Sequence, residues 1–318
     1  MSDRYQKGNP GIILRCDIRH TTKGIQIFTM TIIEPIIRPP SEAYSFLLQI
    51  TVGCSSNTCS FCGAYYNKLF RIKDINEIFV DIEKGASLYP EKRKVFLLDG
   101  DALQCETDKL LAILDKINFE FPRLTRVSSY ANGYNISVKD NKELKELAQN
   151  KLKFIYMGLE SGSQKVLDLC KKKSGVEEMI ESVKRSAQVG IKSSVIVLLG
   201  LGGKRFSDIH VKETIKALNK MQPRYLSFLT LMLIPGTELF EQAEKGEFES
   251  LTPKEILSES YRIIKGLDLK GTIFRSDHAS NYLTLEGRFP QGKPKFLKTI
   301  EKAMNGKLKL NPESLRGL

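Results

Sequence analysis

The sequence predicts an α/β protein in which parallel strands form an incomplete barrel. Apolar runs of strand length alternate with amphipathic stretches of helical length, which is the pattern of repeated βα units around a parallel sheet. Six such units can be counted, fewer than the eight of a closed barrel. This favours a partial (β/α)6 barrel over the doubly wound sheet that the same pattern permits.

Each predicted element follows from its local pattern. The predicted strands are, in chain order, 46–53 (FLLQITVG), 94–100 (KVFLLDG), 124–132 (LTRVSSYAN), 153–160 (KFIYMGLE), 192–200 (KSSVIVLLG) and 224–233 (RYLSFLTLML). Helices are predicted over 75–89, 106–119, 176–190 and 211–221, with glycine or polar residues near their ends. We expect an N-terminal extension (1–40), a barrel core (41–245) and a C-terminal extension (246–318) that closes the barrel mouth. Within the first part, residues 1–29 precede Met30 and read as an upstream segment.

Composition restricts the class of protein. No run approaches the ~18 apolar residues of a membrane-spanning helix, and the N-terminus lacks the pattern of a signal peptide. We therefore expect a cytoplasmic protein that does not engage a membrane. Six cysteines in 318 residues do not make a disulfide framework, because Cys16, Cys105 and Cys170 are far apart in sequence. Reduced thiols and a metal fit this usage better.

The charge indicates an anionic partner without identifying it. The formal net charge is +12, but the lysines are spread over helical faces such as KDNKELKELAQNKLK, without interleaved aromatic residues. Solvated helix faces explain most of them. A phosphorylated metabolite, a nucleic acid and simple solubility all stay compatible with the charge.

Unusual residues follow the predicted strands, at the end of a parallel barrel where active sites lie. Three cysteines, Cys54, Cys59 and Cys62, follow the first strand as CSSNTCSFC. The segments DGDAL, SYANG, LESGS and LGLGGK follow the next four strands. Because the carboxyl ends of parallel strands share one side of the sheet, all these segments should face one mouth.

Three clustered thiols allow more than one interpretation. A structural zinc site normally takes four ligands, and only a distant residue such as His278 could complete it. A [4Fe-4S] cluster held by three thiolates instead keeps one iron open for a cofactor or substrate. Three buried cysteines without a chemical role are the third interpretation, which the polar surroundings of the thiols disfavour.

At this point the chain resembles a known family, the radical S-adenosylmethionine (SAM) enzymes. The resemblance covers about residues 40 to 240 and starts from the cysteine triad, with Phe61 just before its third cysteine. LLDGDAL lies where such enzymes carry a Gly-Gly-Glu type motif, here as Gly100 and Asp101. The segment MGLESGSQKVLDLCKK looks like that of the branch with oxygen-independent coproporphyrinogen oxidases, methylthiotransferases and tRNA-modifying acetyltransferases.

Two departures from the family pattern are visible. The triad reads CxxxxCxxC, with four residues instead of three between the first two cysteines, and the acid of the amino-binding motif is an aspartate. A loop absorbs one extra residue at a cost of a fraction of a kcal/mol, so the cluster still fits.

The resemblance implies both a mechanism and partners. The triad would hold a [4Fe-4S] cluster that binds SAM, and reductive cleavage would give a 5'-deoxyadenosyl radical that abstracts hydrogen from a substrate in the barrel. A flavodoxin- or ferredoxin-type protein would supply the electron. The substrate stays unidentified.

Further candidates come from matching positions, each beside a plainer alternative. Glu160 would contact SAM or act as a helix N-terminal acid, and Lys172 would bind the methionyl carboxylate or be solvated. Tyr130 would line the site or shape a turn, and Gly200 would allow backbone contact to adenine or serve an ordinary turn.

The most unusual C-terminal stretch is FRSDHASNYLTLEGRFP. A subgroup of the family whose reaction is unsettled is similar in carrying RPPSEA, DGDAL and RS(N/D)HASNYL together, and all three occur here. We expect this stretch to close the mouth and contact substrate, with His278 and Tyr282 as catalytic candidates, His278 because its pKa of about 6.5 suits proton transfer. A polar loop that satisfies its own backbone is the alternative.

Two other classes of function stay open. A non-catalytic Fe-S or zinc protein that binds nucleic acid predicts no SAM binding and a steep salt dependence. An Fe-S electron carrier predicts redox chemistry without SAM cleavage. Neither class explains why so many unusual segments follow neighbouring strands.

Overall fold

The computed structural model describes residues 32–65 and 68–317. Its centre is an eight-stranded sheet in the order β1, β4, β5, β6, β7, β8, β9, β10. These strands are β1 (Phe46–Leu48), β4 (Lys94–Leu97), β5 (Arg126–Ala131), β6 (Leu152–Glu160), β7 (Lys192–Leu199), β8 (Tyr225–Thr230), β9 (Ile273–Arg275) and β10 (Glu286–Arg288). Neighbours are parallel from β1 to β9, and β10 is antiparallel. In the described chain β1 and β10 are the two sheet edges, so the predicted α/β partial barrel is confirmed.

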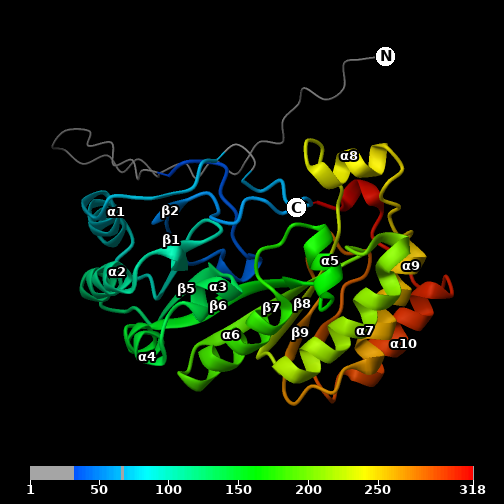
Figure 1. Ribbon diagram of the computed structural model, residues 1–318. Coiled ribbons are helices and arrows are strands. Elements are labelled where there is room, and N and C mark those ends of the chain that lie inside the picture. Colours follow the sequence, from blue (N-terminus) through cyan, green and yellow to red (C-terminus); the bar gives the residue numbers. More distant parts are fainter. Residues whose placement is uncertain (1–31, 66–67, 318) are drawn as a thin grey trace, which may run out of the picture.

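Helices cover the outer side of the sheet, except α8 (Glu238–Glu244), which lies apart from the sheet at the top right of the view (Figure 1). They are α1 (Ile75–Leu88), α2 (Thr107–Glu120), α3 (Gly133–Ser137), α4 (Asn141–Gln149), α5 (Gln164–Leu169), α6 (Val176–Gln188), α7 (Gly203–Met221), α8 (Glu238–Glu244), α9 (Pro253–Gly266) and α10 (Lys293–Met304). Short 3-10 turns are η1 (Pro40–Glu42), η2 (Ala102–Gln104) and η3 (Glu313–Leu315). No helix in this part of the chain is both long and apolar enough to cross a membrane.

Side-chain caps explain where several helices begin. The Asp74 carboxylate accepts a hydrogen bond from the Asn76 N–H at the start of α1. Reciprocal capping boxes begin α4, at Asp140 and Glu143, and α9, at Thr252 and Glu255. Such caps satisfy backbone N–H groups that have no partner within the helix.

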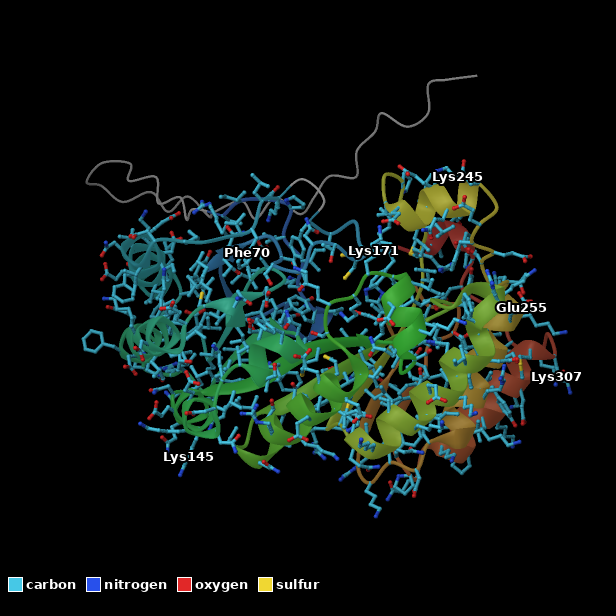
Figure 2. The ribbon with its side chains drawn as sticks, in the orientation of Figure 1. Phe70, Lys145, Lys171, Lys245, Glu255 and Lys307 are labelled. Carbon is cyan, nitrogen blue, oxygen red and sulfur yellow. The ribbon has the colours of Figure 1, made fainter. Side chains whose placement is uncertain are left out.

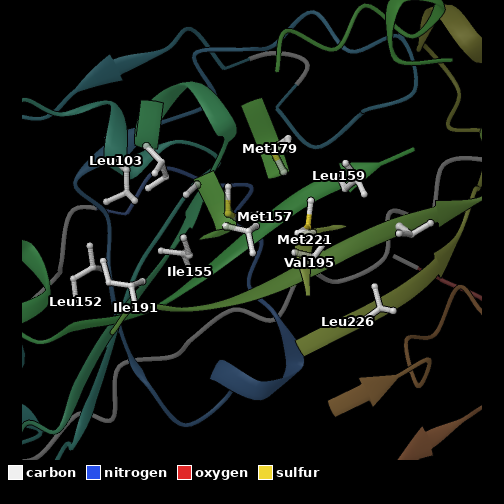
Figure 3. Packing of buried hydrophobic residues seen from close by; sticks show 14 of the residues in the cluster. Leu103, Leu152, Ile155, Met157, Leu159, Met179, Ile191, Val195, Met221 and Leu226 are labelled. Atoms are coloured by element: carbon white, nitrogen blue, oxygen red, sulfur yellow. The ribbon is translucent and has the colours of Figure 1, made fainter. Parts of the chain in front are cut away.

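The core lies between the sheet and these helices. Alternating strand residues, among them Met157, Val195 and Leu226, point toward the helices and are fully buried. Met179 of α6 and Met221 of α7 pack into the same cluster (Figure 3). The other face of each strand is therefore left for the concave interior of the barrel.

The lower part of that concave face is filled by aromatic side chains and by the segment before β1. Phe96, Tyr130, Phe154, Tyr156 and Tyr225 contact one another there. Ile32 and Ile36 pack against this cluster, and the buried Glu42 accepts hydrogen bonds of 2.6 Å from the Arg126 guanidinium and of 2.6 Å from the Tyr156 hydroxyl. The described end of the predicted N-terminal extension is thus part of the barrel floor, whereas residues 1–29, Met30 and Cys16 lie outside the described residues.

Two details differ from the predicted strands. The predicted strand 46–53 is divided into β1 and β2 (Thr51–Val52), and β2 pairs antiparallel with β3 (Arg71–Ile72) in a separate ribbon. The predicted C-terminal extension also contributes β9 and β10 to the main sheet. Both strands have three residues, too few for a periodic pattern to reveal them.

Candidate active site

The three cysteines lie in a loop that leaves β2 and returns to β3. This cysteine loop, described over 53–65 and 68–70, is held at its base by the β2–β3 ribbon. Its far side is tied to neighbouring loops, because the Ser60 N–H donates to the Cys170 carbonyl (3.0 Å) and the Leu239 N–H donates to the Ser60 carbonyl (2.8 Å). Cys170 follows α5 and Leu239 belongs to α8, so the loops after β2, β6 and β8 meet here.

Burial and mutual proximity both act on the thiols. Burial, together with the charges of Asp101, Cys59 and Cys62, raises the pKa of Cys54 to about 12. Burial likewise raises the pKa values of Cys59 and Cys62, and Cys62 acts on Cys59. Three such thiols stay protonated unless a metal takes up their charge.

The donor set fits a cluster better than a single ion. Within residues 32–65 and 68–317, no three His, Cys, Asp or Glu side chains stand close enough together to share one metal ion. A four-iron cluster makes a different demand, since each thiolate binds its own iron. All five described cysteines are free of disulfides, which leaves the triad available to iron.

Asp99 fixes both ends of the cysteine loop. Its buried carboxylate accepts from the Gly53 N–H (2.8 Å), where the loop begins, and from Lys68 Nζ (3.1 Å), where it returns. Gln49 Nε2 donates to the same oxygen (2.9 Å), and Lys68 also donates to the Pro35 carbonyl (2.5 Å). Burial raises the pKa of Asp99, while the Gly53 N–H and Lys68 oppose that rise.

Gly100 and Asp101 lie against the first cysteine. A Cβ on Gly100 would stand 2.8 Å from Cys54 Cβ, so only glycine allows this approach. The Asp101 carboxylate accepts from the Ser55 hydroxyl and from Asn132 Nδ2 (3.2 Å). Burial raises the pKa of Asp101, and these hydrogen bonds oppose the rise. The predicted amino-binding pair therefore adjoins Cys54.

Glu160 and Lys172 lie on the other side of the thiols. Lys172 Nζ is 3.8 Å from Glu160 Oε1, and both side chains are largely buried. Their charges act on Cys59 and on Cys62, where Lys172 lowers the thiol pKa and Glu160 raises it. Glu160 ends β6 with a φ of 61°, beside a register shift in the pairing with β7. Burial raises the pKa of Glu160 itself, and Lys172 opposes this rise.

Three other predicted residues line the surroundings of the thiols. The Phe61 side chain packs against an apolar cluster that includes Cys170, Leu201 and Leu239. Tyr130 lies on the concave aromatic floor, where burial raises its pKa. Gly200 has a φ of 83°, and its N–H donates to the Glu259 carboxylate (2.6 Å).

The FRSDHASNY segment is fastened to the carboxyl end of β8. The Thr230 N–H donates to Ser280 Oγ (3.1 Å), and Asn281 Nδ2 donates to the Phe228 carbonyl (2.7 Å). The half-buried His278 accepts from the Ser280 N–H at Nδ1 (3.1 Å). Burial lowers the pKa of His278, whereas Asp277 raises it.

Tyr282 is engaged by the C-terminal residues. Its hydroxyl donates to the Glu313 carboxylate (2.9 Å), and the Arg316 guanidinium donates to that hydroxyl and stacks 4.0 Å from the ring centre. No contact within the described residues joins His278 or Tyr282 to the three cysteines. The catalytic roles of both residues stay predictions.

Sequence reasoning missed a buried polar connection between two of these loops. His210 of α7 is fully buried, with Nδ1 2.8 Å from Ser161 Oγ and Nε2 3.6 Å from Glu259 Oε1. Glu259 of α9 also accepts from Ser207 Oγ (2.5 Å). This arrangement links the loop after β6 to the loop after β7. A histidine and a glutamate on the apolar faces of two helices were the available signal.

Charged side chains on the outside show no single basic face among those labelled in Figure 2. Lys145, Lys245 and Lys307 lie at different edges of the molecule in this view, and Lys171 lies nearer its centre. Lys171 sits on the side of the cysteine loop and pairs with Glu238 of α8 (2.6 Å).

Comparisons with known proteins place this architecture. The profile of the Radical SAM superfamily matches residues 48–218. An uncharacterized protein of Methanocaldococcus jannaschii is 30% identical over 105 residues, which are 33% of this chain and 32% of that protein. A protein of the same organism, provisionally named a methylthiotransferase, is 27% identical over 151 residues, 44% of this chain and 32% of that one. The matched part of this chain therefore spans about a third of the length of each relative.

Among solved structures, coproporphyrinogen III oxidase from Escherichia coli, described as a radical SAM enzyme, is similar in fold. It superposes with a TM-score of 0.53 and 15% sequence identity, over 70% of this chain and 52% of that one. At this identity the likeness concerns the fold alone.

Proposed function

The chain belongs to the radical SAM superfamily, and we propose that Cys54, Cys59 and Cys62 hold its [4Fe-4S] cluster while the concave barrel face holds an anionic organic substrate. Enzymes of this family use a [4Fe-4S] cluster and SAM, and they need a reductant. One observation carries the assignment of the triad: three disulfide-free cysteines lie in one loop, Gly100 packs against Cys54, and Asp101, Glu160 and Lys172 are close enough for their charges to act on the thiols. We assign the chain to the branch of the coproporphyrinogen oxidases and methylthiotransferases on its LESGS segment.

A bound [4Fe-4S] cluster would supply the electron for reductive cleavage of SAM, and thereby the radical chemistry for hydrogen abstraction from the substrate. The residues of the chain bind and orient the cofactor. Gly100 lets the backbone approach SAM, and Asp101 accepts hydrogen bonds from its amino group. Lys172 receives the methionyl carboxylate, with Glu160 beside it as the neighbouring polar contact.

The remaining predicted residues shape the cavity around these groups. Gly200 admits adenine along the backbone after β7, and Tyr130 forms part of the aromatic floor. Phe61 fastens the cysteine loop to the apolar cluster around Cys170. Because these surroundings exclude water, they protect a radical from side reactions.

His278 is the proposed proton donor or acceptor of the substrate half-reaction. Tyr282 is the second proposed catalytic residue. Burial holds the pKa of His278 below about 6.5, which keeps the imidazole neutral near pH 7 and able to accept a proton. Arg316 and Glu313 hold the Tyr282 hydroxyl in one position, so Tyr282 acts through orientation of the mouth. A flavodoxin- or ferredoxin-type protein in the reducing cytoplasm is the proposed electron donor.

The test is anaerobic. Protein reconstituted with iron and sulfide is given SAM and dithionite, and 5'-deoxyadenosine is quantified for the wild type and for Cys54→Ala, Cys59→Ala and Cys62→Ala. We expect deoxyadenosine from the intact triad alone. Four-iron absorbance without cleavage would support the electron-carrier alternative, and retention of zinc instead of iron would refute the assignment of the triad.

A matched pair of variants tests the SAM contacts. Lys172→Met removes the buried ammonium near Cys59, whereas Lys171→Met removes the exposed one that pairs with Glu238. A hydrogen bond to a charged group is worth about 1.5–3 kcal/mol, so Lys172→Met should weaken SAM binding about 10- to 100-fold. Equal SAM affinity in both variants would contradict the assignment of Lys172.

A further inference from the structure

Two arginines from opposite ends of the chain face the concave interior, and the proposed reaction leaves both unexplained. Arg38 belongs to RPPSEA and Arg275 to FRSDHASNY. Neither side chain forms a hydrogen bond or an ion pair with any residue of the described part of the chain. Arg38 is half-buried and close enough to Tyr130 to oppose the rise of the Tyr130 pKa. Arg275 is exposed at the end of β9.

Strand register shows where the Arg275 side chain lies. Phe274, its neighbour in β9, packs in the core with Phe228 and Phe296. Because successive side chains in a strand point to opposite faces, Arg275 points to the concave side. Its register partner in β8 is Ser227, which pairs with Ile196 of β7.

Ile196 is in turn the register partner of Gly158 in β6. The row Gly158, Ile196, Ser227 and Arg275 thus crosses four neighbouring strands at one height. At a strand spacing of about 4.8 Å, Arg275 lies about 14 Å along the sheet from Gly158. We call these four residues the shelf.

The shelf lies one level above the aromatic floor of the concave face. The first three shelf residues are half-buried and Arg275 is exposed, whereas Tyr156, two residues below Gly158, is 6% exposed and covered by Glu42. Directly above Gly158 stands Glu160, which pairs with Lys172 beside the thiols. A molecule on the shelf would therefore lie beneath the proposed SAM site.

The charges around the shelf indicate the charge of a molecule that could bind there. Two other sets of ionic groups toward this interior are paired, Glu42 with Arg126 (2.6 Å) and Glu160 with Lys172 (3.8 Å), while the Asp101 carboxylate accepts hydrogen bonds from Ser55 and Asn132. Asp277 is exposed, and its charge acts on His278. The two arginines are thus the cations without a counter-charge, and a guanidinium binds carboxylate or phosphate oxygens in a bidentate manner.

We infer that the shelf binds a small organic anion, with its carboxylate or phosphate group on Arg275, its uncharged part over Ile196 and Ser227, and Arg38 on the opposite wall adding positive potential. Identifying this anion as the substrate of the enzyme rests on the proposed function. The anionic group on Arg275 in β9 would lie three strands away from β6, whose last residue, Glu160, lies beside the thiols. The carbon that reacts is consequently at the uncharged end.

Direct binding tests the inference without any turnover. The anaerobically reconstituted protein is titrated calorimetrically with hexyl phosphate, hexanoate and hexylammonium. We expect the phosphate and the carboxylate to bind and the ammonium not to bind. The stronger of the two anions identifies the acidic group of the substrate.

Variants locate the site. Arg275→Gln should weaken anion binding about 10- to 100-fold, and Arg38→Gln should weaken it less, because Arg38 contributes through potential rather than contact. Arg275→Lys keeps the positive charge but loses the paired N–H donors of the guanidinium, so this variant should bind anions with intermediate affinity. Arg93→Gln removes an equal charge at an exposed position before β4 and should bind like the wild type.

Circular dichroism and four-iron absorbance confirm that each variant is folded and loaded. Equal binding of hexylammonium and hexyl phosphate, or anion binding unchanged in both Arg275 variants, would overturn the inference. If the wild type binds anions through Arg275 but makes no deoxyadenosine, the proposed function fails and the anion site stands. If deoxyadenosine forms while anions fail to bind, the anion site fails and the proposed function stands.

Discussion

Replacing Asp99 should separate the stability of the fold from its ability to hold iron. Asp99→Leu leaves the buried Lys68 ammonium facing an apolar side chain and leaves the Gly53 N–H without its acceptor. Lys68 Nζ lies 3.1 Å from Asp99 Oδ2, with the two side chains 4% and 0% exposed. Removing one partner of a buried ion pair costs about 3–5 kcal/mol.

The lower end of that range applies here, because Lys68 keeps its hydrogen bond to the Pro35 carbonyl. We therefore expect a loss of about 3 kcal/mol in the free energy of unfolding. With a urea dependence of about 3 kcal/mol per molar, the unfolding midpoint should fall by about 1 M.

The double variant Asp99→Leu/Lys68→Leu gives the sharper result. Burial raises the pKa of Asp99 despite its cation, so the charged pair itself stabilises the fold little. Two apolar residues should therefore recover part of the lost stability, since a leucine at position 99 must also adopt the left-handed backbone with its φ of 68°. They cannot restore the acceptor for the Gly53 N–H, so the cysteine loop should still be poorly anchored and iron per protein should stay low.

The assay is urea unfolding followed by circular dichroism, together with iron content after anaerobic desalting. Asp81→Asn is the control, since it weakens another buried pair, Lys73 Nζ to Asp81 Oδ2 at 2.7 Å, away from the thiols. It should lower stability and keep iron. A loss below about 1 kcal/mol in Asp99→Leu, or full iron content in the double variant, would refute this reasoning.

Two further predictions concern a glycine and a histidine. Gly100→Ala should lower iron content at least severalfold, because the new Cβ would stand 2.8 Å from Cys54 Cβ. The control Gly317→Ala meets no atom within 4 Å and should load iron normally. Equal iron content in the two variants would contradict the close packing of Gly100 against Cys54. Burial lowers the pKa of His210 and Glu259 opposes this, so the unfolded chain binds more protons below pH 6.5. Unfolding free energy should therefore fall as pH drops from 6.5 towards 5, and His210→Gln should reduce that slope in pH-series urea titrations; an unchanged slope would count against a buried neutral His210.

Much of the barrel could be predicted because its strands are long and apolar. The runs around Val95, Met157 and Val197 are bounded by polar or glycine-containing segments, and each became a strand of the main sheet. Local pattern fails where pairing depends on distant residues. β9 has three residues and exists because β8 offers a partner, a fact that no local window contains.

The residue types of the candidate site could be predicted from the sequence, but the contacts and backbone conformations that hold them in place could not. Cysteines, glycines and acids at strand ends were visible in the sequence, but backbone conformations were not. Asp99 and Glu160 both adopt left-handed conformations, with φ of 68° and 61°, which non-glycine residues seldom do. Such strain persists only where surrounding contacts hold it, and it clusters at functional sites. Asp99 is held by the Gly53 N–H and by Lys68, whereas Glu160 contacts Lys172.

The C-terminal portion belongs to the scaffold of the site, and its predicted closure of the barrel mouth stays a prediction. Glu259 of α9 accepts from the Gly200 N–H, so the glycine loop proposed to contact adenine takes its position from a helix beyond residue 245. The same carboxylate lies 3.6 Å from His210, which contacts Ser161, the residue after Glu160. Arg275 reaches the concave face only because β9 extends the sheet. The boundary predicted at 245 thus divides the sequence, while the sheet and the proposed cofactor and substrate contacts continue across it.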